Sequence, residues 1–72
     1  MMLLSLSPVG EVNQIKAIWA EDNIRARLEE VGISVDCEVS VVLKTFKEEA
    51  LIVNVNGKRI GIGEELARKI VV

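Results

Sequence analysis

The sequence predicts a mainly β protein: a small barrel of about five strands, with one short α-helix after the first strand and a helical turn before the last. Short segments in which apolar and polar residues alternate predict the strands, and an Asn-Gly pair at residues 56–57 predicts a tight hairpin. The length of 72 residues predicts a single domain, 1–72, and closure into a barrel would leave no edge strand exposed to aggregation.

The first segment is expected to form a turn and then a strand. A β-turn is predicted over Ser7–Gly10, with Pro8 in its second position and Gly10 in its fourth. Residues 11–19 alternate in polarity, which predicts a strand. Its buried face is expected to carry Ile15, Ala17 and Trp19.

A short helix is expected over residues 23–31, where Ile24, Leu28 and Val31 recur at i, i+4 and i+7 and form one apolar stripe. Gly32 should end this helix in a left-handed conformation. In that arrangement Ile33 and Leu28 occupy the two positions whose apolar contact completes a Schellman motif.

The second half of the chain predicts three more strands. Residues 38–44 should form a strand with Val39, Val41 and Leu43 on one face, followed by a polar connection over 45–49. In the hairpin over 51–62, a two-residue turn at Asn56-Gly57 sets the facing pairs. These are Val55 with Lys58, Asn54 with Arg59, Val53 with Ile60, and Leu51 with Ile62.

Residues 63–69 predict a single helical turn with acids at its start and bases at its end, as the helix dipole prefers, and residues 70–72 predict a last short strand. The choice between barrels is between an SH3-like and an OB-like one. A long second hairpin that leads through one helical turn into a terminal strand favours the SH3-like barrel.

The composition argues against several functions. Nine basic residues against 11 acidic ones, and only two aromatic residues, argue against nucleic acid as a partner. The absence of histidine excludes His-based catalysis, and no serine or threonine has a candidate base beside it. We therefore expect no enzyme activity and no cofactor. No segment resembles a signal peptide or a membrane span, so a cytoplasmic protein is expected, associated with a membrane only through a partner.

Other groups that could carry chemistry are assigned structural or solvated roles. The Glu-Glu pairs at 29–30, 48–49 and 64–65 are expected to be solvated, because adjacent helical residues do not face each other, so no metal site is predicted. The lone Cys37 is expected to behave as a small buried apolar residue. Gly61 and Gly63, in the sequence GIGEE, are expected to serve turn or bulge geometry.

A basic surface remains as the candidate binding site. Arg25 and Arg27 lie within three residues on the short helix, and Lys58 and Arg59 follow the hairpin turn. They could form a face for phosphate or an acidic partner. Alternatively they are solvated, with Arg25–Glu29 and Arg27–Glu30 paired along the helix.

The order of these segments over nearly the whole chain resembles ferrous iron transport protein A, the FeoA family. The resemblance depends on Leu6, Pro8 and Gly10 before the first strand, and on Arg25, Arg27, Leu28, Val31 and Gly32 in the helix and at its end. In the closing segment it depends on Gly57, Ile60, Glu64, Glu65, Ala67 and Ile70. The chain departs from the family pattern at Val35-Asp36 and in the charged connection 44–49.

The resemblance implies an SH3-like fold and a non-catalytic accessory role in ferrous iron uptake, with the cytoplasmic GTP-binding part of the iron permease FeoB as the partner. The expected partner-binding residues are Arg25, Arg27, Glu29, Lys58 and Arg59. The expected structural motif is Pro8, Gly10, Leu28, Gly32, Ile33, Asn56 and Gly57.

Two other functions stay open. One is a metal-responsive interaction domain, which resembles the C-terminal domain of iron-dependent repressors and could join carboxylates of two copies in a homo-oligomer. The other is a small RNA-binding barrel, which would need more basic and aromatic surface than this chain has.

Overall fold

The computed structural model describes residues 1–72 except Phe46 and Glu48. Along the chain it contains a 3₁₀ turn η1 (Leu4–Leu6), strands β1 (Val12–Gln14) and β2 (Ala17–Ile18), helix α1 (Asp22–Glu30), strands β3 (Glu38–Lys44), β4 (Ala50–Val55) and β5 (Lys58–Gly63), helix α2 (Glu64–Ala67) and strand β6 (Ile70–Val71). Among the described residues, no helix is long and apolar enough to cross a bilayer.

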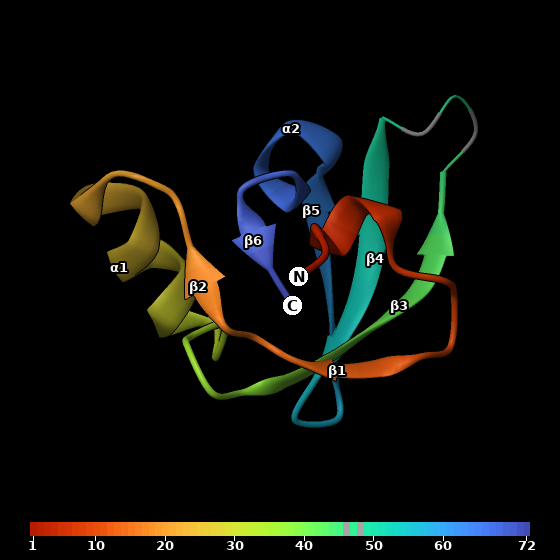
Figure 1. The fold of residues 1–72 in the computed structure, drawn as a ribbon, viewed down its shortest axis with the longest axis horizontal. Coiled ribbons are helices and arrows are strands. Elements are labelled where there is room, and N and C mark those ends of the chain that lie inside the picture. Colours follow the sequence, from red (N-terminus) through yellow and green to blue (C-terminus); the bar gives the residue numbers. More distant parts are fainter. Residues whose placement is uncertain (46, 48) are drawn as a thin grey trace.

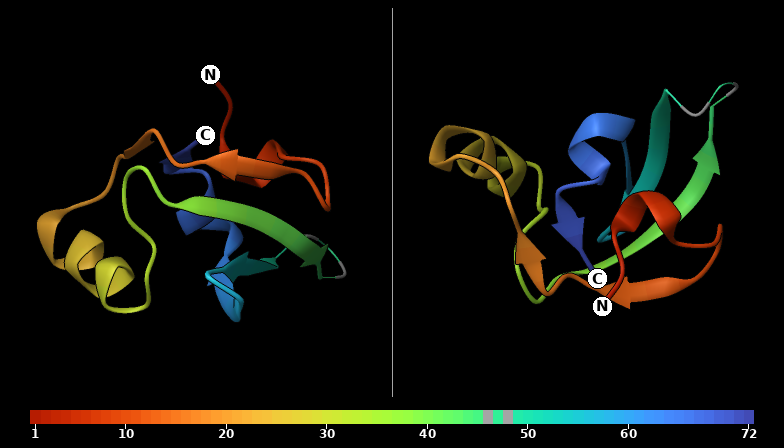
Figure 2. Two further views of the ribbon diagram at one scale, coloured as in Figure 1. Left: turned by 90° about the horizontal axis from the view of Figure 1, so that it is seen from below. Right: turned by 45° about the horizontal axis from the view of Figure 1, so that its top comes forward.

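The strands form two antiparallel sheets: a four-stranded sheet in the order β1-β3-β4-β5 and a two-stranded sheet of β2 and β6. Figure 1 shows α1 at one side of the molecule, beside β2 and remote from the end of β3. The chain ends lie side by side, since Met2 and Val72 exchange backbone hydrogen bonds of 3.1 and 2.7 Å (Figure 2, right). The mainly β prediction is confirmed, although the barrel is not closed: within the described residues, β5 pairs with neither strand of the small sheet.

The predicted first strand is two strands, which raises the total from about five to six. The chain leaves the large sheet at Ile15, whose N–H donates to Cys37 O, and joins the small sheet at Lys16, whose N–H donates to Val71 O. This crossing breaks the alternation of faces. Ile15 and Ile18 are buried as a result, whereas Trp19, predicted to be buried, is 56% exposed.

The predicted turn over Ser7–Gly10 lies one residue later in the chain. The Glu11 N–H donates to Pro8 O, so Gly10 occupies the third position of the turn. Its φ of +89° is the positive value that a type II turn requires there, and glycine adopts it without strain.

The predicted end of the helix is confirmed. Gly32 has a φ of +92°, its N–H donates to Glu29 O, and the Ile33 N–H donates to Leu28 O, which are the two hydrogen bonds of a Schellman motif. Leu28 and Ile33 are both buried in the core. Val31 was wrongly placed on the apolar stripe: it is the C-cap residue, outside regular helix geometry, and is 44% exposed.

A bulge in β3 overturns another predicted position. Val41 faces Val53 and Leu43 faces Ile52, so Val42 is an extra residue in the ladder. The extra residue moves Leu43 to the other face of the strand. Val39 and Val41 are buried as predicted, but Leu43 is 45% exposed.

The β4–β5 hairpin has the predicted register, including the Val55–Lys58, Asn54–Arg59, Val53–Ile60 and Leu51–Ile62 pairs. Asn56 and Gly57 have φ values of +54° and +80°, the positive values that a type I′ turn needs. Gly61 and Gly63 pair in unbroken register with Ile52 and Ala50, so the turn or bulge geometry expected of these two glycines is wrong.

The end of the chain follows the prediction, with α2 as a single turn before β6. The predicted polar connection over 45–49 includes Phe46 and Glu48, which lie outside the described residues. Its two ends are joined, since the Thr45 N–H donates to Ala50 O at 2.9 Å and the Ala50 N–H donates to Thr45 Oγ1 at 3.0 Å.

The conformation of Gly32 predicts a selective loss of stability. Alanine at its φ of +92° is strained by about 1–2 kcal/mol, and the new Cβ would lie 3.4 Å from Asn56 Nδ2. We expect Gly32→Ala to lower the free energy of unfolding in urea by this amount. Gly61→Ala is the matched control, because Gly61 lies in a strand without a positive φ, and it should leave stability unchanged or slightly raised. Equal losses in both variants would contradict this account of the helix end.

Trp19 provides an optical test of the crossing between sheets. It is the only tryptophan, tyrosine is absent, and more than half of its side chain is exposed. We expect the native protein to emit at the long wavelength of a solvated indole, with little shift on unfolding and ready quenching by iodide. A blue-shifted, protected emission would mean that Trp19 is buried, as continuous strand alternation predicts.

Candidate functional site

Helix α1 carries three of the predicted site residues, and the structure gives them different surroundings. Leu28 is buried and Ile24 is half-buried, so this side of the helix packs against the rest of the domain. Arg25 forms an ion pair with Asp22, Nη2 to Oδ1 at 2.7 Å, instead of the expected pair with Glu29. Arg27 and Glu29 are exposed, and neither forms an ion pair within the described part of the chain.

A groove of about 460 Å³ lies between α1 and α2. Three of its lining side chains are apolar and three are charged, two of them basic. The lining residues are Ile24, Arg27, Leu28, Gly63, Glu65, Leu66 and Lys69. We call this the α1–α2 groove. It suits an apolar side chain that carries or neighbours a carboxylate, because it offers aliphatic walls beside two exposed cations.

Arg27 is the one predicted partner-binding residue in the lining of this groove; Arg25, Glu29, Lys58 and Arg59 are not. Leu66 and Lys69 were missed as site residues. Their spacing on the last helical turn was visible in the sequence, but the approach of α2 to α1 was not.

Lys58 and Arg59 begin β5, and both are exposed. Their side chains point to opposite faces of the sheet, as neighbours in a strand do. The preceding turn reaches the end of α1: a Cβ on Gly32 would lie 3.4 Å from Asn56 Nδ2. The end of the helix and the start of β5 are therefore neighbours, and Figure 2 (left) shows α1 and the β4–β5 hairpin on the same side of the molecule.

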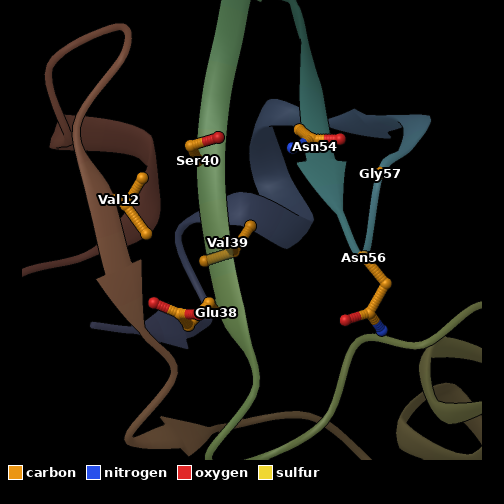
Figure 3. Close-up of a pocket in the computed structure, with 7 residues that line it drawn as sticks. All are labelled: Val12, Glu38, Val39, Ser40, Asn54, Asn56 and Gly57. Atoms are coloured by element: carbon orange, nitrogen blue, oxygen red, sulfur yellow. The ribbon is translucent and has the colours of Figure 1, made fainter.

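A second hollow, of about 350 Å³, lies over β1, β3 and the β4–β5 turn (Figure 3). Val12, Ser40 and Asn54 form a row across three strands in register. Glu38 is the one charged side chain among the described residues of the lining, and Asn56 and Gly57 close the hairpin end. This hollow offers hydroxyl and amide groups but a single carboxylate, which is too little charge to hold a divalent cation unaided.

The other candidate groups have ordinary surroundings. Among the described residues, no three His, Cys, Asp or Glu side chains gather as metal ligands would. Glu64 pairs with Arg68 at 3.2 Å, and Glu48 of the 48–49 pair lies outside the described residues. Cys37 is half-buried against the core, with its Sγ 3.0 Å from Ser34 Oγ.

Comparison of the sequence with models of protein families identifies its family. A family model described as the FeoA domain matches residues 2–72. The chain belongs to the FeoA family. This family is linked to ferrous iron transport, and the resemblance seen in the sequence is confirmed. No curated protein matches the sequence significantly.

Solved structures show that the FeoA chain has the SH3-like fold predicted for it. FeoA of Stenotrophomonas maltophilia, solved in complex with zinc, is 30% identical, with a TM-score of 0.83 over 100% of this chain and 89% of that one. That protein is described as a procaryotic SH3 domain protein and as a candidate activating factor of bacterial ferrous iron transport. FeoA of Chlorobium tepidum is 24% identical, with a TM-score of 0.90 over 97% of this chain and 67% of that one.

The structural similarity extends to longer chains, of which this chain covers less than half. Iron(II) transport protein A of Clostridium thermocellum is 18% identical, with a TM-score of 0.91, and this chain covers 43% of its length. A manganese-dependent transcriptional repressor, solved with manganese, is also 18% identical, with a TM-score of 0.83, and this chain covers 34% of it. At these identities the likeness is one of fold.

The exposed arginines of α1 should matter little for stability. Exposed ion pairs such as Arg25–Asp22 contribute a few tenths of a kcal/mol, and the Arg27 side chain remains in contact with solvent. We expect Arg25→Ala and Arg27→Ala each to change the free energy of unfolding by less than about 0.5 kcal/mol. A loss of several kcal/mol in urea denaturation would show that these residues support the fold instead of being free to bind a partner.

Proposed function

We propose that this FeoA chain is a non-catalytic, cytoplasmic accessory protein of ferrous iron uptake that binds the cytoplasmic GTP-binding part of the iron permease FeoB. The observation that carries the proposal is the α1–α2 groove, in which apolar side chains lie beside the exposed Arg27 and Lys69. Membership of a family linked to ferrous iron transport supports the choice of partner.

The proposed contact surface consists of the predicted partner-binding residues together with the groove. Arg27 lies in the lining, Arg25 and Glu29 are on the same helix, and Lys58 and Arg59 follow the turn that reaches the end of that helix. Apolar residues at the centre of a surface with charges around it are typical of protein interfaces, where the buried centre supplies most of the affinity. The charges set the rate of association and the choice of partner.

Binding of the purified chain to the isolated GTP-binding part of the permease tests this proposal. Calorimetry should be run with GTP, with GDP and without nucleotide. We expect saturable binding in at least one state, and Arg27→Glu should weaken it on the order of tenfold by reversing a charge beside the apolar contact. Lys16→Glu is the matched control, since Lys16 is exposed and does not line the groove, and it should bind as the native chain does. Absence of binding at high micromolar concentration in every state would refute the proposal.

A metal-responsive interaction domain is the second candidate. The observation that favours it is the likeness in fold to the manganese-dependent repressor, with a TM-score of 0.83. Under this alternative, Fe²⁺ or Mn²⁺ would change the size of the oligomer in analytical ultracentrifugation. An unchanged sedimentation profile with both ions would rule it out.

A further inference from the structure

The free edge of β5 is the feature that carries a further inference. β5 is the last strand of the four-stranded sheet, so in the described part of the chain it has a partner strand on one side only. The two-residue turn makes Val55–Lys58 and Val53–Ile60 hydrogen-bonded pairs, and the intervening Asn54–Arg59 pair a non-hydrogen-bonded one. The backbone N–H and C=O groups of Arg59 and Gly61 therefore point away from β4.

Apart from the charged Lys58 and Arg59 at its start, this edge has, within the described residues, none of the usual devices that stop another strand from pairing. Across the described residues, neither Arg59 nor Gly61 forms a backbone hydrogen bond outside the β4–β5 ladder, and both residues are exposed. β5 contains no proline and has no bulge. Natural edges are protected by such features or by a covering segment. At Gly61 and Gly63 the edge even lacks side chains, so an approaching backbone would meet no obstacle there.

The edge leads into the α1–α2 groove. Gly63 ends β5 and also lines that groove, together with Ile24 and Leu28 of α1 and Leu66 just before the end of α2. A strand hydrogen-bonded to Arg59 and Gly61 would reach Gly63 within a few residues, at about 3.3 Å per residue. The next side chain of this added strand that points toward the domain would then lie level with the apolar lining of the groove.

The charges around the edge and the groove indicate the chemistry of the occupant. Four exposed basic residues lie here, Arg27 and Lys69 beside the groove and Lys58 and Arg59 at the start of the edge. None of the four is in an ion pair among residues 1–45, 47 and 49–72. The groove lining also contains the acidic Glu65, so along the edge and the groove four basic residues stand against one acid, whereas the chain as a whole carries a net charge of −2. This local excess of positive charge matches acidic side chains.

We propose that the free edge of β5 binds an extended, acidic segment of a partner protein as an added strand, with one apolar side chain of that segment in the α1–α2 groove. Backbone hydrogen bonds supply affinity in this binding mode, and the groove and the surrounding cations supply selectivity. The inference rests on the proposed function, because it states how the cytoplasmic part of the permease would be bound.

Two substitutions at Gly61 test the added strand. Gly61→Pro removes an N–H that points away from β4, so it blocks the edge while leaving the β4–β5 ladder in place. Gly61→Ala keeps this N–H and places a Cβ 3.5 Å from Ile52 Cδ1, an ordinary contact, and is the matched control. With the GTP-binding part of the permease as the probe, we expect Gly61→Pro to weaken binding at least about tenfold and Gly61→Ala to bind as the native chain does.

Amide hydrogen exchange of the native chain in the complex provides a measurement that needs no variant. We expect exchange at Arg59 and Gly61 to slow at least about tenfold when the permease part is bound, since both N–H groups would then be hydrogen-bonded. Binding that leaves these amides unprotected, or that Gly61→Pro does not weaken, overturns the added strand while leaving the proposed function intact. No binding at all overturns both. Protection that depends on the concentration of this chain alone makes a second copy the occupant and overturns the partner segment.

Discussion

The Asn56–Gly57 turn joins β4 to β5 through two residues, and this length determines which side chains of both strands face the core. Leu51, Val53 and Val55 are all but fully buried because the turn sets them on the inner face. The two-residue turn also sets which residue pairs of the hairpin are hydrogen-bonded, and therefore which backbone groups of β5 point away from β4. The hairpin also packs against the end of α1, since a Cβ at Gly32 would lie 3.4 Å from Asn56 Nδ2 and 3.6 Å from Val55 Cγ1.

The parts of the fold that the sequence predicted well are those set by neighbouring residues. The hairpin register depends on two turn residues, and the end of α1 depends on Gly32 and the apolar residues on either side of it. Trp19 and Leu43 were misplaced because their exposure depends on distant partners. The strand that should bury Trp19 is divided where the chain crosses between Cys37 and Val71, and a bulge in β3 turns Leu43 outward. The alternation of polarity along one strand does not reveal a crossing between sheets or a bulge.

In the candidate site too, residues identified by their sequence neighbours were predicted, and residues brought together by distant contacts were not. Arg27 could be selected because two arginines close together on a short helix are more than solubility requires. Leu66 and Lys69 could not, since the α1–α2 groove exists only when two helices separated by residues 31–63 approach each other. The link to ferrous iron transport came from the family resemblance and was confirmed by the family model. The open barrel was not foreseen, because closure was expected to remove the edge that the structure leaves free.

Hydrogen exchange of the isolated monomer, measured residue by residue along β5, tests most directly whether the hairpin turn sets the register and leaves the outer edge of β5 free. We expect slow exchange at Lys58, Ile60 and Ile62, whose N–H groups face β4, and fast exchange at Arg59 and Gly61, whose N–H groups face solvent. Slow exchange at all five amides would mean that the edge is covered in the free protein. The reverse alternation would mean that the turn does not set the register.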